Sequence, residues 1–167
     1  MEVRLGRRED VPTVLALVRR VVPLMRAGGN FQWDDQYPNA AAFERDVDQG
    51  WLWVAEVQGQ VAGAAAITTE QEPEYAEVGW DPGERAVVVH RLLVDPAFRG
   101  QGLAAALMRL AEEVARNWDI AVLRVDTNKA NAATQRLFPR LGYTFAGEIG
   151  LGFRPGLRFH CYEKRLG

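Results

Sequence analysis

A glycine-rich turn between a strand and a helix is the segment best suited to bind a charged ligand. The turn reads Arg99-Gly100-Gln101-Gly102-Leu103-Ala104, and it follows the apolar β-branched run 87–94. A helical pattern begins at Gly102, and the first amides of a helix lack intrahelical partners and lie at the positive end of its dipole. Glycines carry no Cβ, so the backbone can approach phosphate oxygens closely. The segment therefore predicts a site for a phosphate-bearing ligand.

Three classes of phosphate ligand compete for this turn. A nucleoside triphosphate site needs a Lys-Ser or Lys-Thr pair after the second glycine, where this chain has Leu103-Ala104. A dinucleotide is the closer rival, because residues 100–105 satisfy Gly-x-Gly-x-x-Ala and Asp126 could serve as the ribose-binding acid. Against it, the segment Asp95 to Arg99 separates the strand from the first glycine, and too little βαβ pattern follows. Coenzyme A is the third class.

Several motifs around the turn resemble the GNAT N-acetyltransferase superfamily. That family's pyrophosphate loop has three fixed places, which Arg99, Gly102 and Ala104 occupy, and its preceding strand ends in a pattern like residues 92–96. Further motifs follow at the family's spacing: Leu123-Arg124-Val125, Asn131, Leu137-Phe138 and Gly142-Tyr143. The resemblance covers about residues 86–149. It implies an α/β fold with a mixed, mostly antiparallel sheet flanked by helices, and direct acetyl transfer from acetyl-coenzyme A to an amine.

The resemblance also implies which residues hold acetyl-coenzyme A. The backbone of Leu92, Leu93 and Val94 would pair with the pantetheine arm, where this strand parts from the next. The turn 99–104 would hold the pyrophosphate through its amides, which belong to Arg99, Gly100, Gln101, Gly102, Leu103 and Ala104. Asn131 would contact the pantetheine, and Phe138 would lie beside the cofactor on the following helix.

Acetyl transfer needs a base for the amine, and His90 is the first candidate. Its ordinary pKa near 6.5 suits work at neutral pH, although a strand histidine can equally be hydrogen-bonded within the core. Glu77, in the acidic stretch before the strand, is the reserve. Many family members carry at position 138 a Tyr that protonates the leaving thiolate, and Phe138 has no proton to give. Tyr143 or Cys161 could replace it, or the chain could be a coenzyme A-binding module with weak or lost catalysis.

The amine acceptor is expected to contact two aromatic-rich segments. The first is Met25 to Pro38, with Trp33 and Tyr37, and the second is the acidic loop 68–85, with Tyr75 and Trp80. Aromatic faces and acidic neighbours attract ammonium groups, although aromatic residues in loops more often cover the core. A small molecule, an amino acid and a peptide N-terminus all remain open as acceptors.

The surrounding pattern predicts one mixed α/β domain over residues 1–167. Strands are expected at 3–5, 51–57, 61–67, 87–94, 121–125, 143–149 and 157–164. Helices are expected at 9–22, 39–49, 102–117 and 131–137, and Pro139 should kink or end the last of them.

Composition narrows the choice of partners and compartment. The 167 residues carry a formal net charge of −2, which gives no basic footprint for nucleic acid. The lone Cys161 cannot form an internal disulfide, and no apolar stretch is long enough to span a membrane. We therefore expect a cytoplasmic protein without membrane, nucleic-acid or metal partners. A homodimer through the terminal strands is plausible.

Overall fold

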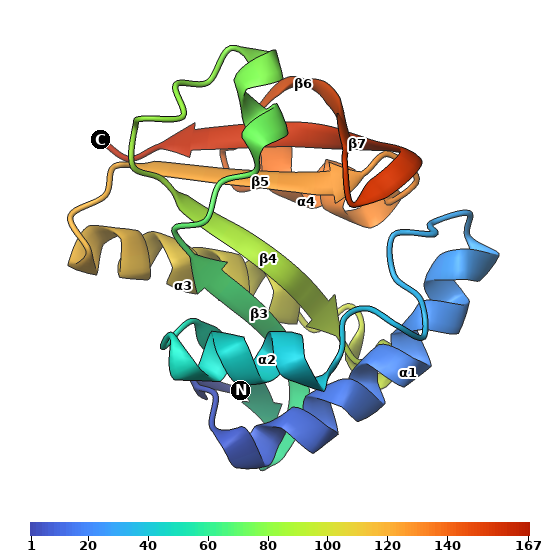
Figure 1. Cartoon of the computed structure of the whole chain (residues 1–167). Helices are drawn as coiled ribbons and strands as arrows, with labels where there is room; N and C mark the ends of the chain where they lie inside the picture. Colours follow the sequence, from blue (N-terminus) through green and yellow to red (C-terminus); the bar gives the residue numbers. More distant parts are fainter.

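Seven strands form one sheet in the computed structural model, which describes residues 1–167 (Figure 1). The strands are β1 (Glu2–Leu5), β2 (Leu52–Val57), β3 (Gln60–Thr68), β4 (Val87–Val94), β5 (Val122–Asn128), β6 (Thr144–Leu151) and β7 (Arg154–Arg165). They lie side by side in the order β1-β2-β3-β4-β5-β7-β6. Only β4 and β5 pair in parallel, so the sheet is mixed and mostly antiparallel, as the sequence predicted.

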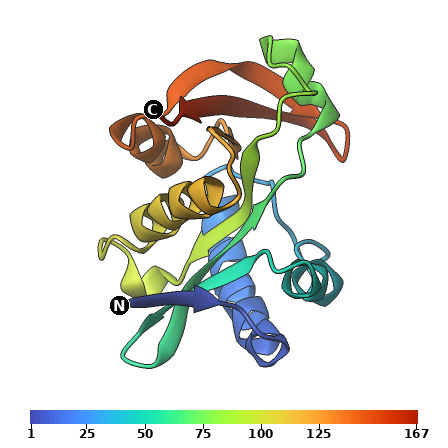
Figure 2. The ribbon, with the colours of Figure 1, turned by 90° about the vertical axis from the view of Figure 1, so that its left-hand side faces the viewer.

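Helices cover both faces of this sheet (Figure 2). On one face lie α1 (Val11–Ala27) and α2 (Ala40–Asp48), and on the other lie α3 (Leu103–Asn117) and α4 (Ala132–Arg140). Three short 3-10 helices complete the chain: η1 (Arg8–Asp10), η2 (Pro73–Val78) and η3 (Pro96–Phe98). Helix α3 buries Leu103, Leu107 and Ala111 against the sheet at helical spacing, which fixes the turn before it at one end of the core.

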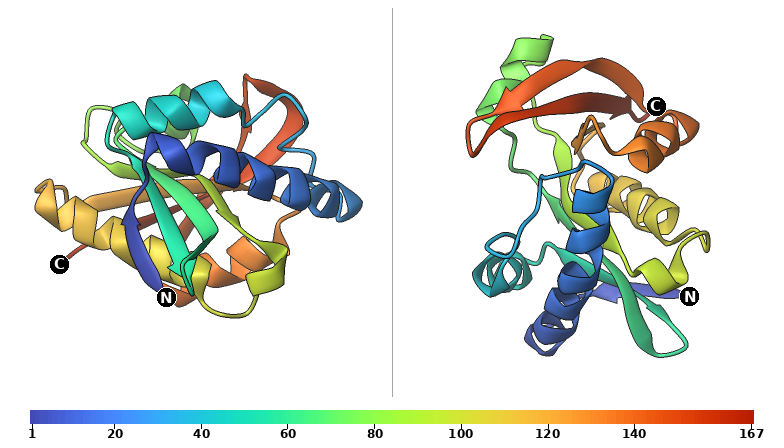
Figure 3. Two further views of the ribbon diagram at one scale, coloured as in Figure 1. Left: turned by 90° about the horizontal axis from the view of Figure 1, so that it is seen from below. Right: turned by 90° about the vertical axis from the view of Figure 1, so that its right-hand side faces the viewer.

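The face that carries α1 has two separate apolar clusters. One packs α1 and α2 on β2–β4 around Phe43 and Leu52, and the other packs η2 on β6 and β7 around Tyr75 and Phe159. The loop 28–39 lies beside the β6–β7 hairpin (Figure 3), where Tyr37 contacts the Phe153 ring edge-on at 6.3 Å between centroids. The two clusters therefore leave the middle of this face, over the end of β4, open to a ligand.

Two prolines lie within helices that were expected to stop before them. Helix α1 continues through Pro23 to Ala27, and α4 continues through Pro139 to Arg140. Both prolines are exposed, so each removes only one helical hydrogen bond near the surface. The expected ends at residues 22 and 137 were therefore too early.

Other boundaries agree closely with the sequence pattern. Strand β4 has the predicted bounds, and α3 begins one residue later than expected. Strand β5 runs three residues further than residue 125, and the loop 68–85 contains η2, held down by buried Tyr75 and Trp80. No helix of this structure is long and apolar enough to cross a membrane.

Candidate active site

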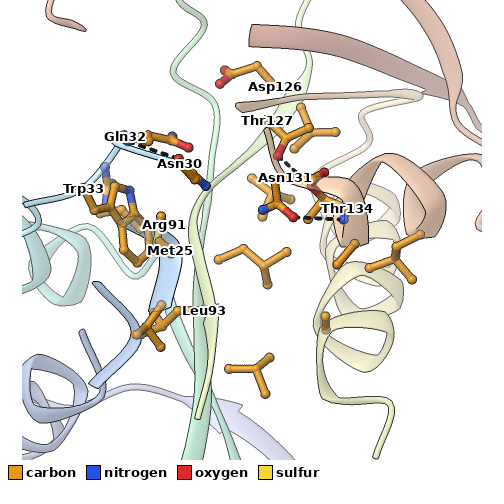
Figure 4. Close-up of a pocket in the computed structure, with 18 of the residues that line it drawn as sticks. Met25, Asn30, Gln32, Trp33, Arg91, Leu93, Asp126, Thr127, Asn131 and Thr134 are labelled. Carbon is orange, nitrogen blue, oxygen red and sulfur yellow. Dashed lines mark hydrogen bonds between the residues drawn. The ribbon is translucent and has the colours of Figure 1, made fainter. Parts of the chain in front are cut away.

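A cavity of about 840 Å³ lies where β4 and β5 separate (Figure 4). The two strands pair only at Val87 with Leu123 and Val88 with Arg124, and then diverge. The cavity is lined on one side by α1, the loop 28–39 and the β6–β7 hairpin, and on the other by β5, α3 and α4. Its size falls in the range of small-molecule and cofactor sites.

The turn before α3 offers a row of free amides to this cavity. None of the backbone N–H groups from Gly100 to Ala105 donates a hydrogen bond to the protein, whereas Ala106 donates to the Gly102 carbonyl at 2.9 Å. The Arg99 N–H, which was also expected to be free, instead donates to the Pro96 carbonyl at 3.4 Å. Gly100 and Gly102 have φ angles of +78° and +79°, which residues with a Cβ rarely adopt. The turn therefore fits a diphosphate.

Most of the other residues expected to bind the cofactor also line the cavity. Leu92, Leu93, Val94 and Phe138 do so, while Gln101 is exposed outside it. Asn131 caps α4, because its side-chain oxygen accepts a hydrogen bond from the Thr134 amide at 3.2 Å, and its side-chain nitrogen Nδ2 has no protein partner. Figure 4 shows that nitrogen directed into the cleft. The diverging strands, the free turn and Asn131 thus bring an open strand edge, free amides and a free side-chain amide to one cavity.

A β-bulge interrupts β4 at the centre of the cavity. Leu93 pairs with Ala64 and His90 with Ala66, so Arg91 and Leu92 together oppose a single residue of β3. Arg91 has a φ of 52°, in the left-handed region that is unfavourable for a residue with a side chain. Bulges leave a backbone group unpaired and often lie next to active sites.

A buried ion pair holds the bulge in place. The Arg91 guanidinium donates from Nε and Nη2 to the two oxygens of Asp46 at 2.7 and 2.6 Å, and from Nη1 to the Tyr37 hydroxyl at 3.0 Å. The Asp46 side chain on α2 is completely buried. Sequence reasoning missed this clamp, because no local pattern joins residue 46 to residue 91.

His90 lines the cavity one residue before the bulge, and the groups around it determine its tautomer and its charge. Its Nε2 lies 2.9 Å from the Glu70 carbonyl oxygen. A carbonyl can only accept, so Nε2 carries the proton and the lone pair is on Nδ1. Burial lowers the pKa of His90, although the hydrogen bond to the Glu70 carbonyl and the nearby Asp126 carboxyl group oppose this. The imidazole is therefore neutral at pH 7 and able to accept a proton at Nδ1.

The acidic side chains that reach the cavity from the loop 68–85 do not include Glu77, the reserve base expected from the sequence. Glu77 is exposed and does not line the cavity, whereas Glu70 and Glu72 do. The Glu72 carboxyl group has no hydrogen-bonding partner in the protein, and burial together with nearby Asp126 raises its pKa to about 7. The acidic residues at 70, 72, 74 and 77 carry no local signal that distinguishes Glu72.

The four loop aromatics divide into two pairs. Trp33 and Tyr37 line the cavity as expected. Tyr75 and Trp80 do not; they are buried against each other with centroids 5.1 Å apart. The Tyr75 hydroxyl instead donates to the carboxylate of Asp126 at 2.5 Å, and Asp126 does line the cavity. Tyr75 can thus influence a ligand only through Asp126.

Neither substitute for a tyrosine at position 138 reaches the cavity. Phe138 packs against the rings of Tyr143 and Tyr162, with centroids 5.9 and 5.4 Å away. The Tyr143 hydroxyl is buried without a partner, and burial raises the pKa of Tyr143. Cys161 is fully buried, which raises its pKa to about 12. No group of His, Cys, Asp and Glu side chains is arranged to hold a metal ion.

Comparisons with known proteins agree with this geometry. Residues 19–143 match the model of the Acetyltransferase (GNAT) family. The uncharacterized N-acetyltransferase YesJ of Bacillus subtilis is 25% identical over 95% of this chain and 86% of its own length. N-acetylaspartate synthetase of Danio rerio is 30% identical over 64% of this chain, but the match spans only 34% of that protein. The structure of yncA from Salmonella typhimurium with its cofactor acetyl-CoA aligns with a TM-score of 0.73 at 22% identity, covering 100% of this chain and 94% of yncA.

Proposed function

The chain belongs to the GNAT family and is an acetyl-coenzyme A-dependent acetyltransferase, and on this premise we propose that it acetylates a primary amine by direct transfer in the cavity between β4 and β5. The observation that carries the proposal is the row of free amides from Gly100 to Ala105 at the cavity edge. The structure of yncA, a protein of the same fold, contains its cofactor acetyl-CoA, which supports acetyl-coenzyme A as the donor.

Some groups of the chain bind the cofactor, and others act on the reacting amine and thioester. The amides of Gly100 to Ala105 bind the pyrophosphate, and Asn131 with the free edge of β4 directs the pantetheine toward the bulge. Acetyl-coenzyme A supplies a thioester, from which a thiolate departs when the amine attacks. A backbone N–H of the bulged segment at Arg91 and Leu92 stabilises the negative charge that develops on the carbonyl oxygen.

His90 accepts the proton that the attacking amine loses. Its Nε2–H is anchored on the Glu70 carbonyl, so Nδ1 is the basic atom. General-base catalysis of this kind contributes about 10²- to 10⁴-fold to the rate. The thiolate leaves without a proton from position 138, because Phe138 cannot donate one.

Release of free thiol from acetyl-coenzyme A across a panel of amines tests the proposal. His90→Ala should lower kcat by about 10²- to 10⁴-fold. The matched control is His160→Ala, which removes the only other histidine; His160 pairs with Glu148 on the β6–β7 hairpin and does not line the cavity. Cofactor binding measured by calorimetry shows that both variants are folded. If no amine raises thiol release while the cofactor still binds, the chain is a coenzyme A-binding module instead.

The acceptor has two candidate classes. The partial similarity to N-acetylaspartate synthetase favours an amino acid. The aromatic residues Trp33 and Tyr37 at the cavity favour an amine with an apolar body.

A further inference from the structure

The cavity lining that comes from α1, the loops 28–39 and 68–85 and the β6–β7 hairpin combines apolar with acidic side chains. We call this part of the cavity, together with Asp126, the acceptor compartment. Its walls are Leu24, Met25, Trp33, Leu151 and Phe153, and its acidic groups are Glu70, Glu72 and Asp126. Asp126 lies on β5, which also borders the cofactor side of the cavity. Successive side chains of a strand point to opposite faces, so Asp126 can face the acceptor compartment while its neighbours on β5 face the cofactor side. Figure 4 shows Asp126 and its neighbour Thr127 directed to different sides, and Tyr75 holds Asp126 from the η2 side.

Each cation near the acceptor compartment is already paired. Arg91 makes its two-pronged contact with buried Asp46. Arg154, stacked on Tyr37, pairs with Asp34 at 3.2 Å. The compartment therefore offers no free positive charge to a ligand.

Two of its carboxyl groups, in contrast, have no cationic partner. Glu70 pairs with Arg45. The Glu72 side chain has no hydrogen bond or ion pair, and the Asp126 carboxyl group, whose pKa is raised by burial, receives only the neutral Tyr75 hydroxyl. His90 beside them is neutral at pH 7. The compartment consequently has a net negative charge once Glu72 ionises.

An α-amino acid would bring its own carboxylate into this field, two bonds from the reacting nitrogen. Like charges about 6 Å apart, at an effective permittivity of about 20, disfavour binding by about 100-fold. An ammonium group on an uncharged body has the opposite sign and is attracted. The apolar walls would bury an alkyl or aryl body of that kind.

We propose that the acceptor is a primary amine with an apolar, uncharged body and no carboxylate next to the amino group, rather than a free amino acid. This inference rests on the proposed function. It assigns Glu72 and Asp126 as the residues that select the acceptor, and Trp33 and Phe153 as residues that contact its body.

Arg91 is the one residue that could instead capture a carboxylate. Three of its five N–H donors are already used by Asp46 and Tyr37, and its charge is balanced by a fully buried carboxylate. Releasing it would abandon the contact that holds the bulge. The geometry therefore favours a structural role for this arginine.

Matched acceptors that differ only beside the nitrogen provide the test. We would measure kcat/KM at saturating acetyl-coenzyme A and pH 8, where Glu72 is ionised, with phenethylamine, phenylalanine and phenylalaninamide. The series tryptamine, tryptophan and tryptophanamide would be measured in parallel. The amide keeps the added bulk and removes the negative charge. Each amine and each amide should exceed its amino acid by about 100-fold.

The possible results separate this inference from the proposed function. Amino acids used within threefold of their amides would overturn the inference alone, because acetyl transfer would still be observed. Absence of thiol release with every amine and every amino acid would overturn both.

A charge-neutral variant tests whether Glu72 is responsible. Glu72→Gln should remove most of the preference of about 100-fold for phenethylamine over phenylalanine, because that figure is the effect of one pair of like charges. The control is Glu113→Gln, which removes the same charge from an exposed position on α3 that does not line the cavity. An unchanged ratio in the Glu72 variant would show that this carboxylate does not select the acceptor.

Discussion

Removing the carboxylate of Asp46 should destabilise the protein far more than removing a similar carboxylate two residues away. Asp46 is completely buried, and its partner Arg91 has only 13% of its side chain exposed. Truncation to alanine would leave a guanidinium in the interior without its counter-charge. Breaking a buried ion pair in this way costs about 3–5 kcal/mol.

The control for this prediction is Asp48→Ala on the same helix. Asp48 pairs with Arg8 at 2.7 Å, but the Arg8 side chain is 57% exposed and the Asp48 side chain 54% exposed. Surface pairs of this kind contribute about 0–1 kcal/mol. For a domain of this size, Asp46→Ala should lower the Tm by about 6–20 °C, and Asp48→Ala by no more than about 4 °C.

Urea unfolding, with the midpoint and slope fitted separately, measures both free energies. Activity measured well below the Tm then tests the role of the clamp in catalysis. If Arg91 holds the bulge that faces the thioester, the Asp46 variant should lose kcat while its KM for acetyl-coenzyme A changes little. Equal losses of stability in the two variants would refute the assignment of a buried clamp.

Three further predictions concern the cofactor turn and the acidic groups. Gly102→Val should abolish acetyl-coenzyme A binding measured by calorimetry. The control is Gly59→Val in the β2–β3 turn, because Gly59 has a similar φ of +77° and equally open surroundings. This control should lose a comparable amount of stability and still bind acetyl-coenzyme A. Because the pKa of Glu72 is raised to about 7 in the fold, the folded state holds more protons than the unfolded state between about pH 4.5 and 7. Stability therefore falls as pH rises through that window, and Glu72→Gln should flatten this part of the urea-unfolding profile. Tyr75→Phe removes the only donor to Asp126 and should lower the unfolding free energy by about 1.5–3 kcal/mol, read from the same urea titration.

Features encoded in local patterns could be predicted from the sequence. The β-branched run 87–94 predicted β4 with its observed bounds, because its short length and its β-branched residues favour a buried strand over a helix. The turn at Gly100 and Gly102 predicted free amides at the start of α3, and these amides have no partners in the fold. Both inferences depend on neighbouring residues only.

Features that depend on packing between distant segments could not be predicted. The bulge at Arg91 arises from the register of β4 against β3, and its clamp joins β4 to α2. Glu70 and Glu72 line the cavity and Glu77 does not, because burial of Tyr75 fixes the orientation of η2. A tyrosine in a polar loop has two common fates, ligand contact or core packing, and sequence alone does not distinguish them.

We infer that the free amides between Gly100 and Ala105 bind the pyrophosphate of acetyl-coenzyme A. Nuclear magnetic resonance titration of the ¹⁵N-labelled protein tests it residue by residue, with coenzyme A compared against pantetheine, which lacks the diphosphate. The amide signals of Gly100 to Ala105 should shift with coenzyme A and stay in place with pantetheine, while Asn131 responds to both. Tight binding of coenzyme A with those six amides unmoved would contradict the claim.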